Sequence, residues 1–433
     1  MFNLHEKKRR RICRGVFLVV CLAPTCVAAS WAMVVSLPQY RWSHERALGE
    51  LLGLEVSIGG IASPRPGVML YTSVDIFDPE THQKLAHVRL VETWRESGLV
   101  TLRASQPELN EPGFHALWKW LTEDLRKQAP GAPRIHLDAD ELLLKLPGIV
   151  QTIHELRARL EASEAGPQAK LTFRLPGAEM PRPAELTISR NRRTKPPLFR
   201  VDLTTSDSAL PAGLLSPAWP AIERLGSRAT LRGSFWAEHS AGGWRGEASG
   251  DLEEIDLASL VNEQFPHHLS GTATLRLTAA HFDQGRLAMA SGSLAAGPGA
   301  ISRSLVSGAE SSLHCVSPFA ASKNFGKQPS YEKLALEFVI DGRGLAIQGC
   351  EGANRTVLFD GAGNALLQEP AEQLQPVTNL VRLLVPQSEV LVPASQETNQ
   401  LTQFLPVPAV ILKRGTVPEA RNLRLPASAK SDE

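Results

Sequence analysis

The chain has 433 residues, enough to bury a large core in two or three domains or in one elongated β architecture. Its formal net charge is only +1, so no broad basic field favours a nucleic-acid partner. Basic residues are dense only in residues 1–14, which we expect to form a short cytoplasmic segment.

An uncharged apolar segment, residues 15–36, follows this basic run directly. As a helix it would be about 30 Å long, close to the hydrocarbon thickness of a bilayer. The preceding positive charges favour a cytoplasmic N-terminus, and Tyr40 and Trp42 suit the far interface. This pattern predicts a transmembrane signal anchor: one pass through the inner membrane, with the bulk of the chain in the periplasm. A cleaved signal peptide is the alternative, because Val27-Ala28-Ala29 resembles a cleavage site.

Residues 43–165 are predicted to form an N-terminal β region that contains two helices. Alternating segments such as Val68–Phe77 lie between Gly, Pro and Asp turns, which is typical of strands. Asn110 is a candidate N-cap, and apolar residues at helical spacing from Phe114 to Leu125 predict an amphipathic helix. Pro147 is predicted to open a second helix, whose apolar face would hold Ile149, Ile153, Leu156 and Leu160.

Two-residue alternation returns in residues 166–367 and predicts a β-rich region built from short strands. Side chains two residues apart share a face of a strand, so Leu231 and Phe235 would point opposite to Thr230 and Arg232. We expect the apolar face to be lined by Leu231, Phe235, Leu275, Leu277, Leu287, Met289, Leu334, Leu336 and Phe338. Residues 368–433 are rich in Gln, Pro, Ser and Glu, which predicts an extended or disordered tail.

The apolar face of these strands requires cover. If about twenty inward side chains stayed in water, the cost would be about 30–60 kcal/mol, against a net domain stability of about 5–15 kcal/mol. A second sheet would cover the face in a closed sandwich. An incompletely closed sheet would instead form an apolar trough that hydrocarbon chains of a lipid complete. Periodicity alone leaves both arrangements open.

Three stretches of the chain resemble AsmA-like envelope proteins. They are LGELLGLEVSIGGIASPRPGVMLYTSVDIFDPETHQKLAHVRLVE after the basic segment and span, GDLEEIDLASLVNEQFPHHLSGTATLRLTAAHFDQGRLAMASGSLAAGPGAISRSLV, and YEKLALEFVIDGRGLAIQG. The resemblance implies an elongated antiparallel β-sheet curled into a groove, held on the inner membrane and projecting into the periplasm. It implies a role in phospholipid transport or outer-membrane homeostasis, with membrane lipids and other envelope proteins as partners.

The expected fold class is therefore mainly β (α+β), an elongated antiparallel β-sheet curled into a groove with two amphipathic helices and an N-terminal transmembrane helix. About 14 strands at roughly 4.8 Å would stack to some 65–70 Å. The expected function is binding of lipid acyl chains in the groove, in envelope phospholipid transport or outer-membrane homeostasis. A non-catalytic structural or assembly protein of the envelope, with a closed sandwich, is the alternative.

The remaining candidate sites are few. The basic segment SRNRRTKPP could contact an anionic headgroup through Arg190, Arg192 and Arg193. Cys315 and Cys350 are the only cysteines in the exported part, and an oxidising compartment would permit a disulfide between them.

Acidic and histidine-containing segments have ordinary explanations. His136, Asp138 and Asp140 could hold a cation, but the solvated face of a strand explains them better. The acidic run from Asp251 to Asp256 has no second feature of a glycoside hydrolase. The chain contains no GxSxG, Walker, GxGxxG or HExxH motif, so we expect no enzyme activity, cofactor or metal.

Overall fold

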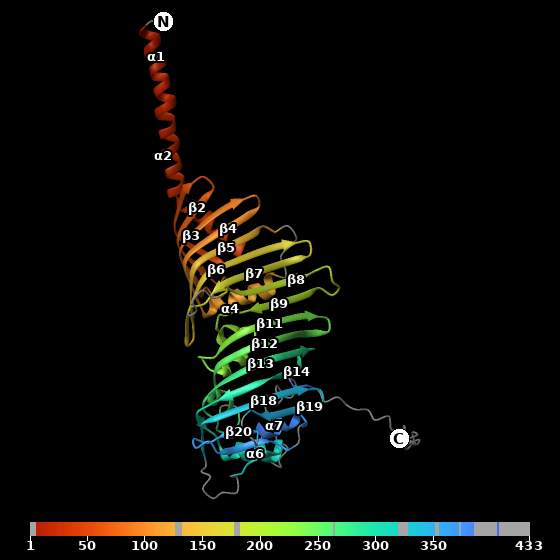
Figure 1. Cartoon of the computed structure of the whole chain (residues 1–433). Coiled ribbons are helices and arrows are strands. Elements are labelled where there is room, and N and C mark those ends of the chain that lie inside the picture. Colours follow the sequence, from red (N-terminus) through yellow and green to blue (C-terminus); the bar gives the residue numbers. More distant parts are fainter. Residues whose placement is uncertain are drawn as a thin grey trace, which may run out of the picture.

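The computed structural model describes residues 6–125, 132–176, 182–262, 265–318, 328–350, 355–371, 374–384 and 405–406. One long curved sheet forms the body, and an N-terminal helix projects from one end of it (Figure 1). The apolar stretch Cys13–Val35 in this helix is long enough to cross a membrane. The predicted apolar segment is thus a single helix of spanning length, separate from the body.

The helices are α1 (Glu6–Phe17), the π-helical η1 (Leu18–Leu22), α2 (Ala23–Ser36), α3 (Pro38–Leu52), α4 (Glu111–Lys119), the π-helical η2 (Trp120–Asp124), the 3-10 helices η4 (Ala212–Leu215) and η5 (Pro220–Leu225), α5 (Leu257–Val261), α6 (Arg303–Leu313) and α7 (Thr378–Leu384). The strands are β1 (Glu55–Arg65), β2 (Val68–Phe77), β3 (Lys84–Glu96), β4 (Leu99–Asn110), β5 (Arg134–Leu146), β6 (Ile149–Ser163), β7 (Gly166–Arg174), β8 (Ala184–Asn191), β9 (Leu198–Thr204), β10 (Leu210–Pro211), β11 (Thr230–Ser240), β12 (Gly243–Asp256), β13 (Thr272–Asp283), β14 (Arg286–Ala296), β15 (Gly299–Ala300), β16 (Cys315–Val316), β17 (Ser330–Tyr331), β18 (Lys333–Asp341), β19 (Gly344–Gly349), β20 (Thr356–Phe359) and β21 (Ala365–Pro370).

The main sheet follows chain order, from β1 to β9 and then through β11, β12, β13, β14 and β18 to β19. At about 4.8 Å per step, this stack is roughly 67 Å long. All of these neighbours are antiparallel except β4 and β5, which are parallel, so the expectation of a purely antiparallel sheet is wrong at this pair. The reason is the helical connection α4–η2, because β5 starts beside the start of β4, with Leu99 opposite Arg134.

A helix is present where the sequence predicts the first one. The side chain of Asn110 accepts a hydrogen bond from the backbone N–H of Gly113 at 3.0 Å, so it caps α4 as expected. The predicted second helix is wrong, because residues 149–163 form strand β6. Glu155 has a φ of 49° at an irregularity in pairing, and this bulge turns Ile153 and Leu156, three residues apart, to the same face. The bulge thus imitates helical spacing within a strand.

The predicted tail is also partly wrong. Its first residues belong to β21 and α7, and Val377 is buried in the core. Leu345 and Gln375 exchange backbone hydrogen bonds of 2.7 and 2.8 Å, which covers the outer edge of β19. These long-range contacts order a segment whose composition resembles a linker. Apart from residues 405–406, the predicted tail after residue 384 lies outside the described residues.

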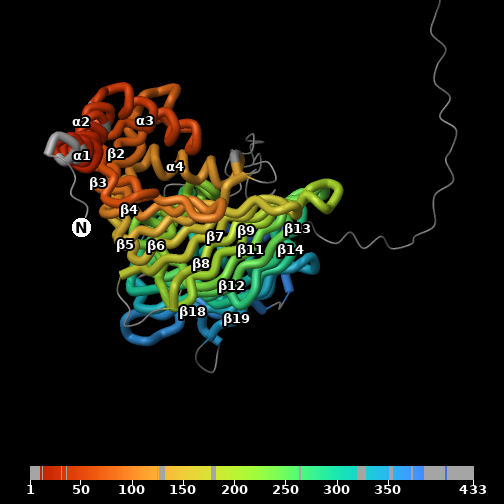
Figure 2. The backbone as a smooth tube through the Cα atoms, turned by 90° about the horizontal axis from the view of Figure 1, so that it is seen from above, coloured from red at the N-terminus to blue at the C-terminus, as the bar shows by residue number. Residues whose placement is uncertain are grey.

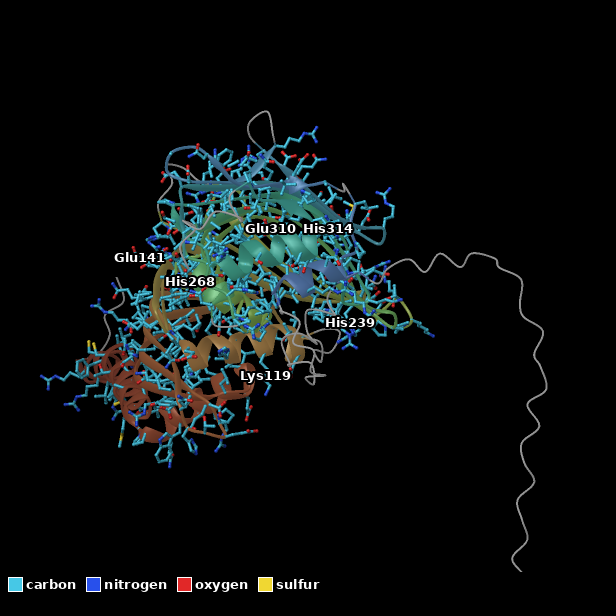
Figure 3. All side chains as sticks on the ribbon, turned by 90° about the horizontal axis from the view of Figure 1, so that it is seen from below. Lys119, Glu141, His239, His268, Glu310 and His314 are labelled. Atoms are coloured by element: carbon cyan, nitrogen blue, oxygen red, sulfur yellow. The ribbon has the colours of Figure 1, made fainter. Side chains whose placement is uncertain are left out.

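The two long rims of the sheet differ. We call hairpin rim the side that carries the tight turns Arg65–Val68, Glu96–Leu99, Ser163–Gly166, Ser240–Gly243, Asp283–Arg286 and Asp341–Gly344. The opposite side, the helix rim, carries the connections that contain η4, η5, α5 and α6. Residues of α6 and of η2 join the same buried clusters as the sheet, and α3 and α4 lie on one side of the curved wall (Figure 2). The helices that carry Lys119 and Glu310 lie inside the curve of the sheet (Figure 3).

A short joint connects the membrane helix to the sheet. Leu37 is extended between α2 and α3, and Pro38 begins α3. Leu48 and Leu52 of α3 pack against the core of β1 to β5. The Glu45 carboxylate accepts a hydrogen bond of 3.0 Å from the backbone N–H of Ile58 on the edge strand β1. The span is therefore fixed to the sheet through a packed helix.

A line of backbone irregularities, which we call the crease, crosses the sheet. It includes Ser73, Gln106 and Glu155, with φ values of 50°, 51° and 49°, and the opposed glycines Gly233 and Gly250, with φ values of 157° and 136°. The regular ladder of pairs is interrupted at the first three positions. Bulges and glycine kinks of this kind bend strands, so the crease accounts for the curl of the sheet.

Replacing Gly250 with Ala tests the crease. A Cβ at this position would lie 2.2 Å from the carbonyl oxygen of Arg232, at a φ that side chains other than glycine rarely adopt. We expect Gly250→Ala to lower the free energy of unfolding by about 1–3 kcal/mol, measured by denaturant titration. The matched control is Gly361→Ala, where an added Cβ meets no atom within 4 Å and should change stability by less than about 0.5 kcal/mol. Equal effects of both substitutions would contradict a strained crease.

Candidate functional site

The apolar concave face is built by strands whose register aligns large aliphatic side chains. Residues directly opposite one another in a sheet share a face and touch. One row crosses five strands, and we call it the leucine row: Leu231, Leu252, Leu275, Leu294 and Leu336. All five side chains are half-buried. The sheet therefore carries a continuous aliphatic strip that runs across its strands.

Two further rows lie beside the leucine row, toward the hairpin rim. The next row, which follows the crease, contains Gly233, Gly250, Leu277, Gly292 and Phe338. The row after it contains Phe235, Ala248, Ala280, Ala290 and Ile340. Glycine and alanine carry little side-chain volume in these two rows, and Ala280, Ala290 and Ile340 are buried in the packed cluster that also contains α6.

The structure brings most of the predicted lining residues together. By register, Leu231, Phe235, Leu275, Leu277, Leu334, Leu336 and Phe338 share the concave face. Leu287 also faces inward but is only 6% exposed, inside the core around α6. Met289 was assigned to the wrong face: it pairs with His281, whereas Leu287 pairs with Phe282, so a bulge at Ala288 separates the two faces.

Helices, and not a second sheet, cover much of the concave face. In the part of the chain that the structure describes, the other sheet is only the two-stranded pair β15–β17. The main sheet does not close on itself, so the sandwich that periodicity allowed is not formed. Leu305 and Val306 of α6 are buried against the lower strands, and Leu121 and Leu125 against the upper ones. In the leucine row, Leu252, Leu275 and Leu294 pack against the α6 cluster and Leu231 packs against the cluster of Leu121 and Leu125, so the row is partly covered and only Leu336 belongs to neither cluster.

The predicted headgroup residues lie at the hairpin rim. Arg190 is near the end of β8, and Arg192 and Arg193 lie in the loop to β9. The backbone N–H of Arg192 donates to the carbonyl of Ala165 at 2.7 Å, which ties this loop to the turn between β6 and β7. The three arginines are thus close to one another in the fold.

The predicted disulfide is not formed. Cys315 is a buried thiol and Cys350 is exposed, and neither is bonded to the other. Burial, together with the charge of Glu310, raises the pKa of the Cys315 thiol to about 12. A thiol with such a pKa is protonated at neutral pH and is a poor nucleophile.

The acidic segments serve the fold. Asp251 pairs with Arg276 at 2.9 Å, and Asp256 caps α5 by accepting a hydrogen bond from the N–H of Ala258. Asp140 lies 3.6 Å from Arg103, and among the described residues no group of three or more acidic, His or Cys side chains could hold a metal. The reading of these segments as solvated strand faces therefore accounts for their contacts.

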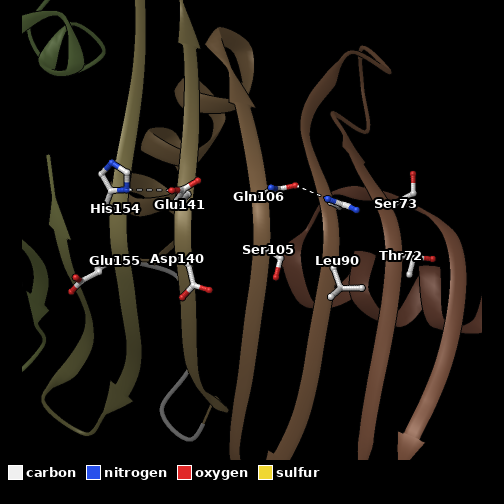
Figure 4. A pocket seen from close by; sticks show the side chains of 10 residues that line it. Thr72, Ser73, Leu90, Ser105, Gln106, Asp140, Glu141, His154 and Glu155 are labelled. Atoms are coloured by element: carbon white, nitrogen blue, oxygen red, sulfur yellow. Dashed lines mark hydrogen bonds and ion pairs between the residues drawn. The ribbon is translucent and has the colours of Figure 1, made fainter. Parts of the chain in front are cut away.

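A polar hollow of about 1050 Å³ opens on the convex face where the crease crosses β2 to β6 (Figure 4). It is lined by Thr72, Ser73, Arg89, Leu90, Ser105, Gln106, Asp140, Glu141, His154 and Glu155. Arg89 donates to the side-chain oxygen of Gln106 at 3.1 Å, and His154 lies 3.7 Å from Glu141. These side chains are mostly exposed and of mixed charge, and they point away from the apolar face.

Sequence reasoning missed two members of the leucine row, Leu252 and Leu294. Leu252 stands between Asp251 and Glu253, so its surroundings look solvated. Leu252 lies two residues after Gly250 and four after Ala248, and this two-residue spacing is typical of side chains that share one face of a strand. That signal was present but weak, because glycine and alanine contribute little hydrophobicity.

No protein-family model, curated protein or solved structure matches this chain. The geometry of the concave face and of its rim therefore carries the functional argument.

Cysteine reactivity checks the two thiol environments. We expect a variant with Cys13, Cys21, Cys26 and Cys350 replaced by Ser to react slowly with maleimide when folded, because Cys315 is buried with a raised pKa. Unfolding in denaturant should restore rapid labelling, measured by mass spectrometry. The unaltered chain should have the same mobility on a denaturing gel with and without prior reduction, because Cys315 and Cys350 are not bonded to each other. A mobility shift that Cys350→Ser removes would contradict this picture.

Proposed function

We propose that this protein is a membrane-anchored lipid-binding protein whose concave face holds hydrocarbon chains, in phospholipid transport or homeostasis of the cell envelope. The observation that carries the proposal is an open sheet whose apolar face includes a half-buried strip of five leucines, in a chain that begins with a helix of membrane-spanning length. Apolar surface of this kind is favourable to cover with an apolar ligand.

The size of the leucine row fits one acyl chain. Its five strands extend about 19 Å at roughly 4.8 Å per step. A lipid chain in one leaflet extends about 15 Å, half of the hydrocarbon core of a bilayer. Each CH₂ group transferred from water to an apolar site contributes about 0.8 kcal/mol, so even partial cover of a chain is strongly favourable.

The packed joint at α3 supports a role next to the membrane. The contacts of Glu45, Leu48 and Leu52 hold the first strands directly beyond the span. A lipid leaving the bilayer would therefore meet the sheet without crossing a long linker. The resemblance to AsmA-like envelope proteins favours the periplasm as the compartment, with the inner membrane as the anchor.

Two substitutions on the concave face test the proposal. Leu277 and Leu336 are half-buried and, among the described residues, belong to none of the packed clusters, so changing them spares the core. We expect a Leu277→Asn, Leu336→Asn variant to retain about tenfold less phospholipid than the unaltered protein after detergent exchange. Lipid is quantified by mass spectrometry per mole of protein, and the melting temperature is measured in parallel.

The matched control is Thr272→Asn with Thr274→Asn, two exposed positions on the opposite face of β13. This control should retain lipid at the level of the unaltered protein. Unaltered protein that is extracted from the membrane without bound lipid would favour the structural or assembly function instead. A Leu277→Asn, Leu336→Asn variant that keeps its lipid would do the same.

The orientation in the membrane is tested by reporter fusions. Positive charge before the span favours a cytoplasmic N-terminus. We expect alkaline phosphatase fused after residue 384 to be active in a bacterial host, and the same fusion to lose activity when Lys7, Lys8, Arg9, Arg10 and Arg11 are replaced by Glu. Activity of a phosphatase fused before the span would contradict this orientation.

A further inference from the structure

The concave face has a polar boundary at the hairpin rim. Four strands contribute one residue each to a single cross-strand row, which we call the lip row: Arg190, Phe199, His239 and Trp244. The rings of Phe199 and Trp244 are 6.1 Å apart edge to face, and those of His239 and Trp244 are 5.0 Å apart. The Trp244 side chain is 40% exposed. Amphipathic rings in this position suit a boundary between apolar and aqueous regions.

The composition changes within one step from the lip row toward the centre of the face. The next row contains Ile188, Val201, Ala237, Gly246 and Phe282. The row after it contains Leu186, Leu203, Phe235, Ala248 and Ala280. A guanidinium and an imidazole thus border a surface that is otherwise aliphatic and aromatic. An amphiphile on this face would place its polar end at the lip row.

The loop beside the lip row adds further positive charge. It holds Arg193 and Lys195, both exposed, and neither forms an ion pair with another described residue. The side chain of Asn191 accepts a hydrogen bond of 2.9 Å from the N–H of Arg193, and Thr194 accepts one of 3.1 Å from the N–H of Leu198. These bonds support the backbone of the loop that carries both cations at the rim.

We propose, building on the lipid-binding function above, that the lip row together with Arg193 and Lys195 binds the phosphate of a phospholipid headgroup. Arg190, Arg193 and Lys195 supply charge-assisted hydrogen bonds to the phosphate oxygens. Trp244, beside the buried Phe199, contacts the glycerol region, and the acyl chain lies on the half-buried positions inside the lip, Phe235, Ala237, Ala248 and Phe282, because the β8 and β9 members of these rows are buried in the core. The site therefore selects lipids that carry a phosphate over neutral lipids with the same chains.

The test compares phosphatidylglycerol with diacylglycerol of identical acyl chains, each bound to the purified full-length protein. We expect the unaltered protein to prefer phosphatidylglycerol, and Arg190→Gln, Arg193→Gln, Lys195→Gln to weaken its binding about tenfold. Binding of diacylglycerol should change less than about twofold, because the aliphatic rows are intact. Added salt should weaken phosphatidylglycerol binding by the unaltered protein more than by the variant.

The matched control removes three exposed cations from the opposite face that form no ion pair with another described residue, as Arg134→Gln, Arg157→Gln and Arg159→Gln, and should bind both lipids like the unaltered protein. Equal affinity for both lipids, or an equal loss in the control, overturns the lip site and leaves the acyl-chain function standing. Binding of inorganic phosphate as tight as that of phosphatidylglycerol also overturns it, because the site would then be one for free phosphate and not for a lipid. If the unaltered protein binds neither lipid, the lipid-binding function itself fails.

Discussion

The whole architecture depends on covering the apolar side of one continuous sheet that does not close on itself. Each strand places aliphatic side chains on that side. Exposing all of them to water would cost more free energy than the net stability of a folded domain. The chain meets this demand with helices that pack on the concave face: α4 and α6 enter from the helix rim, whereas α7 follows Gln375, whose backbone pairs with Leu345 beside the Asp341–Gly344 turn. The hairpin rim carries the tight turns and the basic β8–β9 loop.

Much of this fold follows from local sequence, and its exceptions have specific causes. Alternation identified the strands and the shared face of Leu231, Leu275 and Phe338, because side-chain direction repeats every two residues. Bulges defeat that rule: the one at Glu155 made a strand look helical, and the one at Ala288 put Met289 on the wrong face. The segment around Gln375 is ordered by pairing with Leu345, which local composition does not predict. The lip row depends on the pairing register between strands, which the sequence of a single strand does not predict.

The proposed lipid site joins two features that differ in how they arise. The aliphatic interior is a repeated property of many strands, so it tolerates variation at any one of them. The lip row is a single coincidence of register between four strands and one basic loop. A slip of two residues between β8 and β9 would move Arg190 away from Phe199 while keeping the apolar side chains of both strands on the same face. Selectivity for the headgroup is therefore the more fragile of the two properties.

At β1 and at β19, other residues of the chain form hydrogen bonds with the edge of the strand. At β1 the free N–H of Ile58 is taken by Glu45, and at β19 the backbone of Leu345 is paired with Gln375. These two hydrogen-bonded positions hinder a second copy from pairing along the whole of either strand. The ribbon has a length set by its own sequence. In the proposed lipid function, a single molecule of this protein therefore offers a hydrocarbon chain a surface of fixed extent.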